Sequence, residues 1–208
     1  MTRPQIEFFY FLGSGYAYLS VMRIEKVADH AGVTVHWRPF SVRALMRENN
    51  IGLRDQPGKM RYIWRDIERR ARWHEIPFDK PPIWPTDPDE LANRVAIVAF
   101  AEGWGREYTK ASFRSWYLDG QPLGEPEALH QVLASLDKNA VETVAKANST
   151  EAHASYAAET EAARKLGIFG SPAFVADGEV FWGDDRLEEA IAWAGMKHPA
   201  QVGDKGKR

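Results

Sequence analysis

The first forty residues show three successive hydrophobic patterns. Residues 6–12 form a short apolar and aromatic run that stops at Gly13, as expected of a buried strand. Residues 16–28 carry apolar side chains mostly three or four positions apart, and Gly32 follows as a stop signal, which predicts a helix. Residues 33–40 alternate between apolar and polar and predict a second strand. Two strands joined by a helix form a β-α-β unit, which predicts a parallel pair in an α/β sheet.

The middle of the chain has no strand pattern of comparable strength. Residues 77–88 are rich in proline and predict an ordered, extended loop, anchored by Phe78, Ile83 and Trp84. Helical periodicity predicts helices over residues 43–49, 60–74, 91–103, 107–118, 126–136, 140–147 and 150–166.

The strand pattern returns near the C-terminus. Residues 173–176 and 179–182 read as two strands joined by the turn pair Asp177-Gly178, and residues 186–194 read as a last helix. Together with the preceding helix, these elements follow each other in the order α-β-β-α. The sequence therefore predicts an α/β protein with a thioredoxin-like fold that is split by a large helical insertion.

This order predicts a division of the chain into segments. Residues 1–40 and 167–197 would form the thioredoxin-like domain, and residues 41–166 would form the helical insertion. Residues 198–208 are polar with scattered glycine and are expected to form a disordered tail.

Composition and charge exclude several classes of function. The chain has 208 residues and a formal net charge of −2, which gives no reason to expect a nucleic-acid partner. It contains no cysteine, which excludes disulfides, thiolate metal sites and a cysteine nucleophile, and nearly excludes a disulfide oxidoreductase. The six histidines show no metal-ligand spacing, so no metal site is expected.

Neither membrane nor export signals are evident. No stretch approaches the roughly 20 apolar residues of a membrane helix, and the polar start of the chain does not read as a signal peptide. We therefore expect a cytoplasmic protein without a membrane partner.

The first candidate site is the Gly13-Ser14-Gly15 turn, where the first strand gives way to the first helix. A helix N-terminus presents unpaired N–H groups and stabilises an anion, including a thiolate. Ser14 reads either as a simple N-cap or as a hydrogen-bond donor to the thiolate of a bound cofactor. A serine hydrolase does not fit, because the surroundings are not Gly-x-Ser-x-Gly and no histidine is near in sequence.

Two further candidate sites lie near the C-terminus. Pro172 directly precedes a predicted buried strand, so either it is cis and exposes the backbone of Ser171 to an extended peptide, or it is an ordinary strand start. Asp184 and Asp185 either suit the dipole of the last helix or bind the ammonium group of an amino-acid ligand.

The fourth candidate is a cationic and aromatic set near the proline-rich loop. It would be a solvated helix face, or it would supply a cation and an apolar wall to an anionic aromatic substrate, together with Trp84. The set comprises Lys59, Arg61, Tyr62, Trp64 and Arg65.

Several blocks of the sequence resemble one family in order and spacing. The segment Phe9-Tyr10-Phe11-Leu12-Gly13-Ser14-Gly15-Tyr16-Ala17-Tyr18-Leu19 is similar to the N-terminal signature of 2-hydroxychromene-2-carboxylate isomerases and kappa-class glutathione transferases. Further blocks are similar to later family segments, and together they span roughly residues 5–195. They are Trp37-Arg38-Pro39-Phe40, residues 57–62 with Asp66 and Arg69, residues 167–174, and residues 181–187.

The resemblance implies a ligand and a set of contacts. Family members bind glutathione and are usually dimers, so a homodimer is expected. By resemblance, Ser14 would contact the glutathione sulfur, and Ser171, before a cis Pro172, would pair with the cysteinyl unit. Asp184 and Asp185 would hold the γ-glutamyl end, and Asn50 matches a possible further contact.

On the substrate side, Lys59 falls in a block beside the family's active-site cleft, and Tyr62 and Trp84 would line the substrate site. The chain departs from the family by having Gly15 where proline is common, Phe11 where aspartate is common, and Ser171 where valine or leucine is frequent.

The resemblance, together with the candidate sites, implies one hypothesis and leaves two alternatives. The hypothesis is a glutathione-dependent isomerase that acts on an aromatic oxo-acid similar to 2-hydroxychromene-2-carboxylate by reversible thiolate addition. The first alternative is a kappa-class-like glutathione transferase, which would consume the thiol. The second is a non-catalytic glutathione- or peptide-binding thioredoxin-like module.

Overall fold

A computed structural model describes residues 3–51, 56–79, 83–197 and 200. Four strands form one sheet in the described part of the chain, in the order β2-β1-β3-β4. β1 (Gln5–Tyr10) pairs in parallel with β2 (Thr34–Pro39), and both β1 and β4 (Glu179–Trp182) run antiparallel to β3 (Ala173–Ala176). The predicted α/β class and thioredoxin-like order are confirmed.

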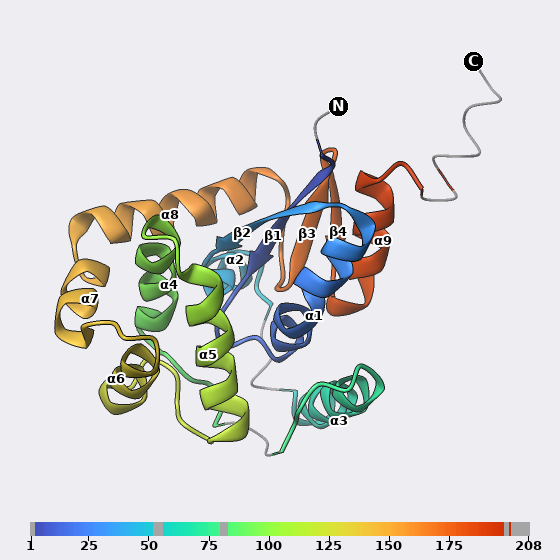
Figure 1. The fold of residues 1–208 in the computed structure, drawn as a ribbon. Coiled ribbons are helices and arrows are strands. Elements are labelled where there is room, and N and C mark those ends of the chain that lie inside the picture. The colour runs from blue at the N-terminus through green and yellow to red at the C-terminus, as the bar shows by residue number, and fades with distance from the viewer. Residues whose placement is uncertain (1–2, 52–55, 80–82, 198–199, 201–208) are drawn as a thin grey trace.

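Helices surround this sheet (Figure 1). α1 (Gly15–Ala31) makes the β1-to-β2 crossover, and a short 3-10 turn (Asp184–Arg186) leads into α9 (Leu187–Ala194). The intervening helices are α2 (Val42–Glu48), α3 (Pro57–Trp73), α4 (Leu91–Ala101), α5 (Gly105–Leu118), α6 (Pro126–Ser135), α7 (Ala140–Ala147) and α8 (Thr150–Lys165).

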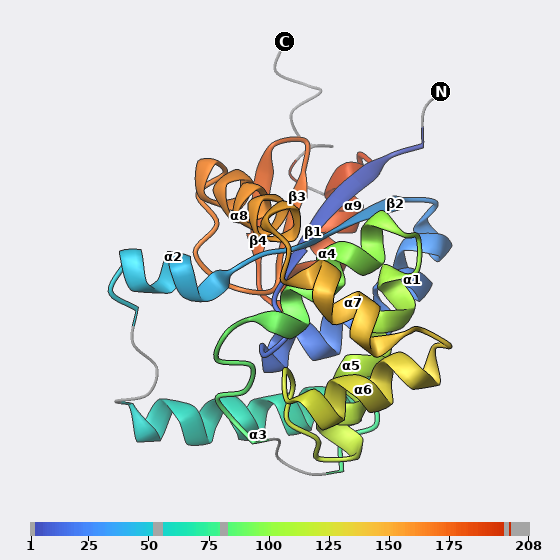
Figure 2. The ribbon, with the colours of Figure 1, turned by 90° about the vertical axis from the view of Figure 1, so that its left-hand side faces the viewer.

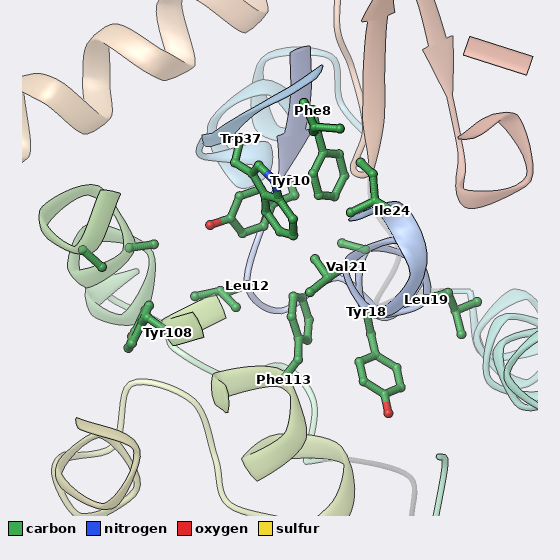
Figure 3. Packing of buried hydrophobic residues seen from close by; sticks show 14 of the residues in the cluster. Phe8, Tyr10, Leu12, Tyr18, Leu19, Val21, Ile24, Trp37, Tyr108 and Phe113 are labelled. Atoms are coloured by element: carbon green, nitrogen blue, oxygen red, sulfur yellow. The ribbon is translucent and has the colours of Figure 1, made fainter. Parts of the chain in front are cut away.

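The alternation of side chains along β1 gives the sheet two buried faces. On one face, Phe8 stacks on Phe174 at 5.2 Å between ring centroids, and Tyr10 meets Trp37 edge-on (Figure 3). This face joins a core that includes α1, α4 and α5. On the other face, Phe9 belongs to a second cluster to which α2 and α8 contribute.

The two predicted domains share the first of these cores. That cluster contains residues of the sheet together with α4 and α5 of the predicted insertion, and Figure 3 shows Phe113 of α5 facing α1. The predicted division thus describes the order of segments along the chain. That residues 1–40 with 167–197 and residues 41–166 form separate domains stays a prediction. The predicted tail, residues 198–208, lies outside the described residues except for residue 200.

Local differences from the sequence prediction have simple causes. α3 begins at Pro57 rather than residue 60, because proline is well suited to the first helical position. The predicted anchoring of the proline-rich loop by Ile83 is wrong, since that side chain is exposed, whereas Phe78 packs against Tyr117. Residues 80–82 of this loop lie outside the described residues.

The described helices include none that is both long enough and apolar enough to cross a membrane. Within the same residues, no group of three or more His, Asp or Glu side chains is arranged to hold a metal ion.

Candidate functional site

The β1–α1 turn lies at a cavity of about 1000 Å³ between α2 and α3. Figure 2 shows these two helices extending toward the same side of the molecule. The lining residues come from six separate segments of the chain. They are Phe11, Gly13–Tyr16, Val42, Arg43, Met46, Arg47, Asn50, Ile51, Lys59, Met60, Tyr62–Trp64, Ile67, Trp84, Pro85, Phe169–Ser171 and Trp182.

Ser14 combines two roles at the start of α1. Its hydroxyl accepts a hydrogen bond from the Ala17 N–H at 3.3 Å, as an N-cap does, and donates one to the carbonyl oxygen of Ser171 at 2.9 Å. The N–H groups of Gly15 and Tyr16 make no hydrogen bond within the described residues, as expected in a first helical turn. Because both residues line the cavity, these donors and the positive end of the helix dipole are available to an anionic ligand atom.

Ser171 faces Ser14 across this turn. The Ser171–Pro172 peptide bond is cis, in agreement with the first reading of the sequence. The Ser171 hydroxyl accepts a hydrogen bond from the Phe11 N–H at 3.0 Å, which ties the segment before β3 to the end of β1. The carbonyl oxygen of Ser171, expected to pair with a peptide ligand, already accepts the Ser14 hydrogen bond, so a ligand would have to share or replace that bond.

A buried amide holds the start of the turn in place. Asn93 of α4 accepts a hydrogen bond from Leu12 N–H at 2.8 Å and donates one to Leu12 C=O at 3.0 Å. The same amide donates to Oδ2 of Asp87 at 3.1 Å, and Asp87 also accepts from Ala92 N–H. Burial raises the pKa of the Asp87 carboxyl above its usual value. This support was not predictable from the sequence, because Asn93 lies 81 positions from Leu12.

Gly15 permits a close approach of α3 to the first turn of α1. A Cβ atom at this position would overlap Cδ1 of Ile67 and would lie 2.8 Å from the Tyr117 hydroxyl. Tyr117 is fully buried, and its hydroxyl has no hydrogen-bond partner within the described residues. The departure from the common proline therefore matches the packing of this chain, since a proline ring would need the space that Ile67 occupies.

Phe11, the second departure, carries a cation on its ring. The guanidinium of Arg43 lies 4.9 Å from the ring centroid and donates to the carbonyl oxygens of Thr86 and Asp87. In this way α2 is joined both to the end of β1 and to the loop that carries Trp84.

The adjacent residues Asp184 and Asp185 have different environments in the structure. Asp184 is 1% exposed, lies outside the cavity lining, and accepts hydrogen bonds from Ser20 (3.0 Å), Arg23 (3.0 Å) and Arg70 (2.8 and 2.5 Å). Its carboxylate oxygens are thus occupied, so the prediction that Asp184 binds the γ-glutamyl end of a ligand does not fit this placement. The Asp185 side chain is 50% exposed and pairs with Arg186 at 2.8 Å, so its predicted role stays a prediction.

The remaining predicted residues divide between the cavity and the surface. Asn50, Lys59, Tyr62 and Trp84 all line the cavity, and Trp64 joins them. Arg61 and Arg65 do not line it, and Arg65 pairs with Glu68 at 2.7 Å, as a solvated helix face would.

Sequence reasoning missed the part of the cavity that α2 provides. Arg43 and Arg47 are one helical turn apart and both line the cavity, although the sequence identified this segment only as a short helix. Phe169 and Trp182 were also missed. They lie within two residues of the predicted Ser171 and Asp184, and their rings meet at 4.8 Å.

The electrostatic character of the cavity is one-sided. Arg43, Arg47 and Lys59 line it, and no acidic residue does so within the described part of the chain. Together with the open N–H groups of α1, this arrangement favours an anionic ligand with an apolar body.

Comparison with known proteins agrees with this geometry. Residues 5–191 match the family described as DSBA-like thioredoxin domain. The chain is 24% identical to a 2-hydroxychromene-2-carboxylate isomerase of Sphingobium xenophagum over 192 residues, covering 90% of this chain and 96% of the relative. It is 29% identical to glutathione S-transferase kappa 1 of Caenorhabditis elegans over 83 residues, covering 39% and 37%.

Among solved structures, a 2-hydroxychromene-2-carboxylate isomerase superposes with a TM-score of 0.81 at 22% identity, covering 97% of both chains. The resemblance stated from the sequence blocks is thus confirmed. Since the family match extends over most of the sequence, this chain belongs to the DsbA-like thioredoxin domain family.

Proposed function

We propose that this protein is a glutathione-dependent isomerase acting on an aromatic oxo-acid similar to 2-hydroxychromene-2-carboxylate. The observation that carries the proposal is the position of Ser14 and the open N–H groups of Gly15 and Tyr16 at a cavity with three cations and no described acidic lining residue. This donor set fits an anionic sulfur, and the chain has no cysteine of its own to supply one. The names of the relatives, an isomerase and a kappa-class transferase, support the same proposal.

The residues around Ser14 would stabilise a thiolate. A free thiol has a pKa near 8.5, so only a few per cent is ionised at neutral pH. The N–H groups of Gly15 and Tyr16 and the positive helix end would raise that fraction. The Ser14 hydroxyl can rotate from the Ser171 carbonyl toward a nearby anion, so it would add one charge-assisted hydrogen bond.

When bound, glutathione supplies a thiolate that adds reversibly to a conjugated double bond, which permits rotation about that bond. The chain's own task is to orient the acid and to exclude water. Lys59 and Tyr62 on α3, together with Trp84, line the cavity and would provide positive charge and aromatic surface for the acid. Asn50, Ser171, Pro172 and Asp185 would contact the tripeptide, and the protein would act as a homodimer in the cytoplasm.

The test is calorimetric titration of glutathione into wild type and Ser14→Ala, in buffers of different ionisation enthalpy. We expect wild type to release protons on binding at neutral pH, and Ser14→Ala to lose most of that release and about tenfold in affinity. Ser149→Ala is the matched control, because Ser149 also caps a helix, accepting from Ala152 N–H at 3.2 Å, but does not line the cavity. It should bind like wild type. No binding at millimolar concentration would refute the proposal.

A second measurement separates the proposed isomerase from the alternatives. The wild type is incubated with glutathione and a conjugated aromatic oxo-acid, and both compounds are quantified. An isomerase changes the acid and leaves total glutathione constant, whereas a transferase consumes glutathione. A binding module would do neither.

A further inference from the structure

Two arginines one turn apart on α2 both line the cavity, but their hydrogen bonding differs. The guanidinium of Arg43 donates to the carbonyl oxygens of Thr86 and Asp87 and lies over the Phe11 ring. Its hydrogen-bonding capacity is therefore largely used to hold the loop after Trp84. Arg43 is a structural cation, although it lines the cavity.

Arg47 differs from Arg43 in its interactions. Its side chain is exposed, and within the described residues it makes no ion pair or hydrogen bond. The neighbouring carboxylate, Glu48, is bound by Arg164 at 2.8 and 2.9 Å. An arginine that lines a cavity without a carboxylate partner has its planar set of donors available to a ligand.

The part of the cavity lining that comes from α2 and from the loop held by Arg43 also contains apolar and aromatic residues. Arg47 follows Met46 on α2, and the loop that Arg43 holds carries Trp84 and Pro85, all of which line the cavity. Phe11 is only 3% exposed, and the Arg43 guanidinium lies over its ring. The lining thus combines the Arg47 guanidinium, which makes no ion pair or hydrogen bond within the described residues, with the flat apolar surface of Trp84 and Pro85.

We propose that Arg47 anchors the carboxylate of a planar aromatic acid whose ring lies against Trp84 and Pro85. The inference deepens the proposed function by naming the residue that recognises the second substrate. Arginine suits this role better than Lys59, because its fork can donate two parallel hydrogen bonds to one carboxylate. Arg47 lies on α2, whereas the N–H donors proposed for the thiolate lie at the start of α1. The acid and the thiol would therefore use separate donors.

The test uses trans-cinnamate as a planar acid and cinnamamide as its uncharged counterpart of similar shape. Affinities are measured by calorimetry for wild type and Arg47→Gln, with Arg61→Gln as the matched control. Arg61 is exposed, makes no ion pair within the described residues and does not line the cavity, so its loss removes the same charge elsewhere.

We expect wild type and Arg61→Gln to prefer cinnamate over cinnamamide by about tenfold or more, and Arg47→Gln to lose that preference. Arg47→Lys, which keeps the charge without the fork, should fall between them. Circular dichroism verifies that each variant is folded.

Either of two results would overturn the proposal: an undiminished preference for cinnamate in Arg47→Gln, or loss of glutathione binding in this variant with the cinnamate preference intact. The second result would assign Arg47 to the thiol ligand. If wild type fails to bind glutathione but shows the Arg47-dependent preference, the proposed function fails while the acid site stands.

Discussion

Two buried aspartates, each about 1% exposed, hold elements that line the cavity by different means. Asp184 is surrounded by charge, because Arg23 of α1 and Arg70 of α3 both donate to its carboxylate. Asp87 receives hydrogen bonds from the Asn93 amide and the Ala92 N–H, while Arg43 donates to its backbone carbonyl rather than to its carboxylate. Asp184 thus forms direct ion pairs, whereas the carboxylate of Asp87 accepts hydrogen bonds from neutral amide groups.

The difference indicates what each region contributes. The ion pairs of Asp184 fix the C-terminal half of α3, whose other half forms a wall of the cavity. The network of Asp87 holds Leu12 and thereby the turn that carries Ser14. Ion pairs and neutral hydrogen bonds hold these structural elements together, whereas Arg47 and Lys59 line the cavity and make no ion pair in the part of the chain that the structure describes.

The largest expected effect comes from removing the charge of Asp184. Asp184→Asn leaves two arginines beside a neutral group, and breaking a buried pair in this way costs about 3–5 kcal/mol of the free energy of unfolding. Urea denaturation followed by tryptophan fluorescence measures this loss.

Asp185→Asn is the matched control, because the adjacent carboxylate is half exposed. Its free energy of unfolding should stay close to wild type, since surface ion pairs contribute little, while glutathione affinity should fall if Asp185 holds the ammonium group. Equal free energies of unfolding for Asp184→Asn and Asp185→Asn would contradict the inference that the buried ion pairs of Asp184 stabilise the fold.

A smaller effect is expected where α3 approaches α1. Gly15→Ala places a methyl group on Cδ1 of Ile67 and should cost about 1–3 kcal/mol of the free energy of unfolding. Adding Ile67→Val removes the clashing carbon, so the double variant should recover part of that loss.

Gly58→Ala in the first turn of α3 is the control, because nothing lies within 4 Å of a Cβ atom there. It should be neutral or slightly stabilising. Equal effects of the two glycine substitutions would show that α3 does not press on the start of α1.

The smallest effect is a pH dependence from Asp87. Burial raises the pKa of this carboxyl in the folded state above 3.8, so the folded protein keeps a proton that the unfolded chain has released. The contribution of Asp87 to the free energy of unfolding therefore falls as pH rises through this window and is regained as pH falls toward about 4.

Wild type and Asp87→Asn should be compared by urea denaturation between about pH 4 and pH 7. The stability of wild type relative to the variant should increase as pH is lowered. A difference that stays constant over this range would mean that Asp87 titrates alike in the folded and unfolded states.

The sequence was sufficient for the fold because each element carries a local signal. The aromatic run of β1, the Asp177-Gly178 turn and the helical periodicities predicted the elements close to their observed bounds. At Asp177 and Gly178 the backbone φ angles are 49° and 83°, the positive values that a two-residue hairpin turn requires.

The candidate site was predictable only in part. Ser14 and Ser171 stand at element boundaries that the pattern marks, and the structure brings them within 2.9 Å. The burial of Asp184 and the open state of Arg47 depend on partners far along the chain, such as Arg70 at 114 positions from Asp184. Periodicity shows which face of a helix is apolar, but it does not show which other helix meets that face.

The paired hydrogen bonds of Asn93 have a consequence for how the site moves. By bonding both the N–H and the C=O of Leu12, one side chain does for β1 what a neighbouring strand would do beyond Tyr10, where the pairing with β2 ends. The turn at Ser14 is therefore coupled to α4 rather than free to fluctuate as a surface loop. Opening of this turn requires either the loss of both Asn93 hydrogen bonds or a shift of α4, so the helical segment restrains the motion of the site as well as its shape.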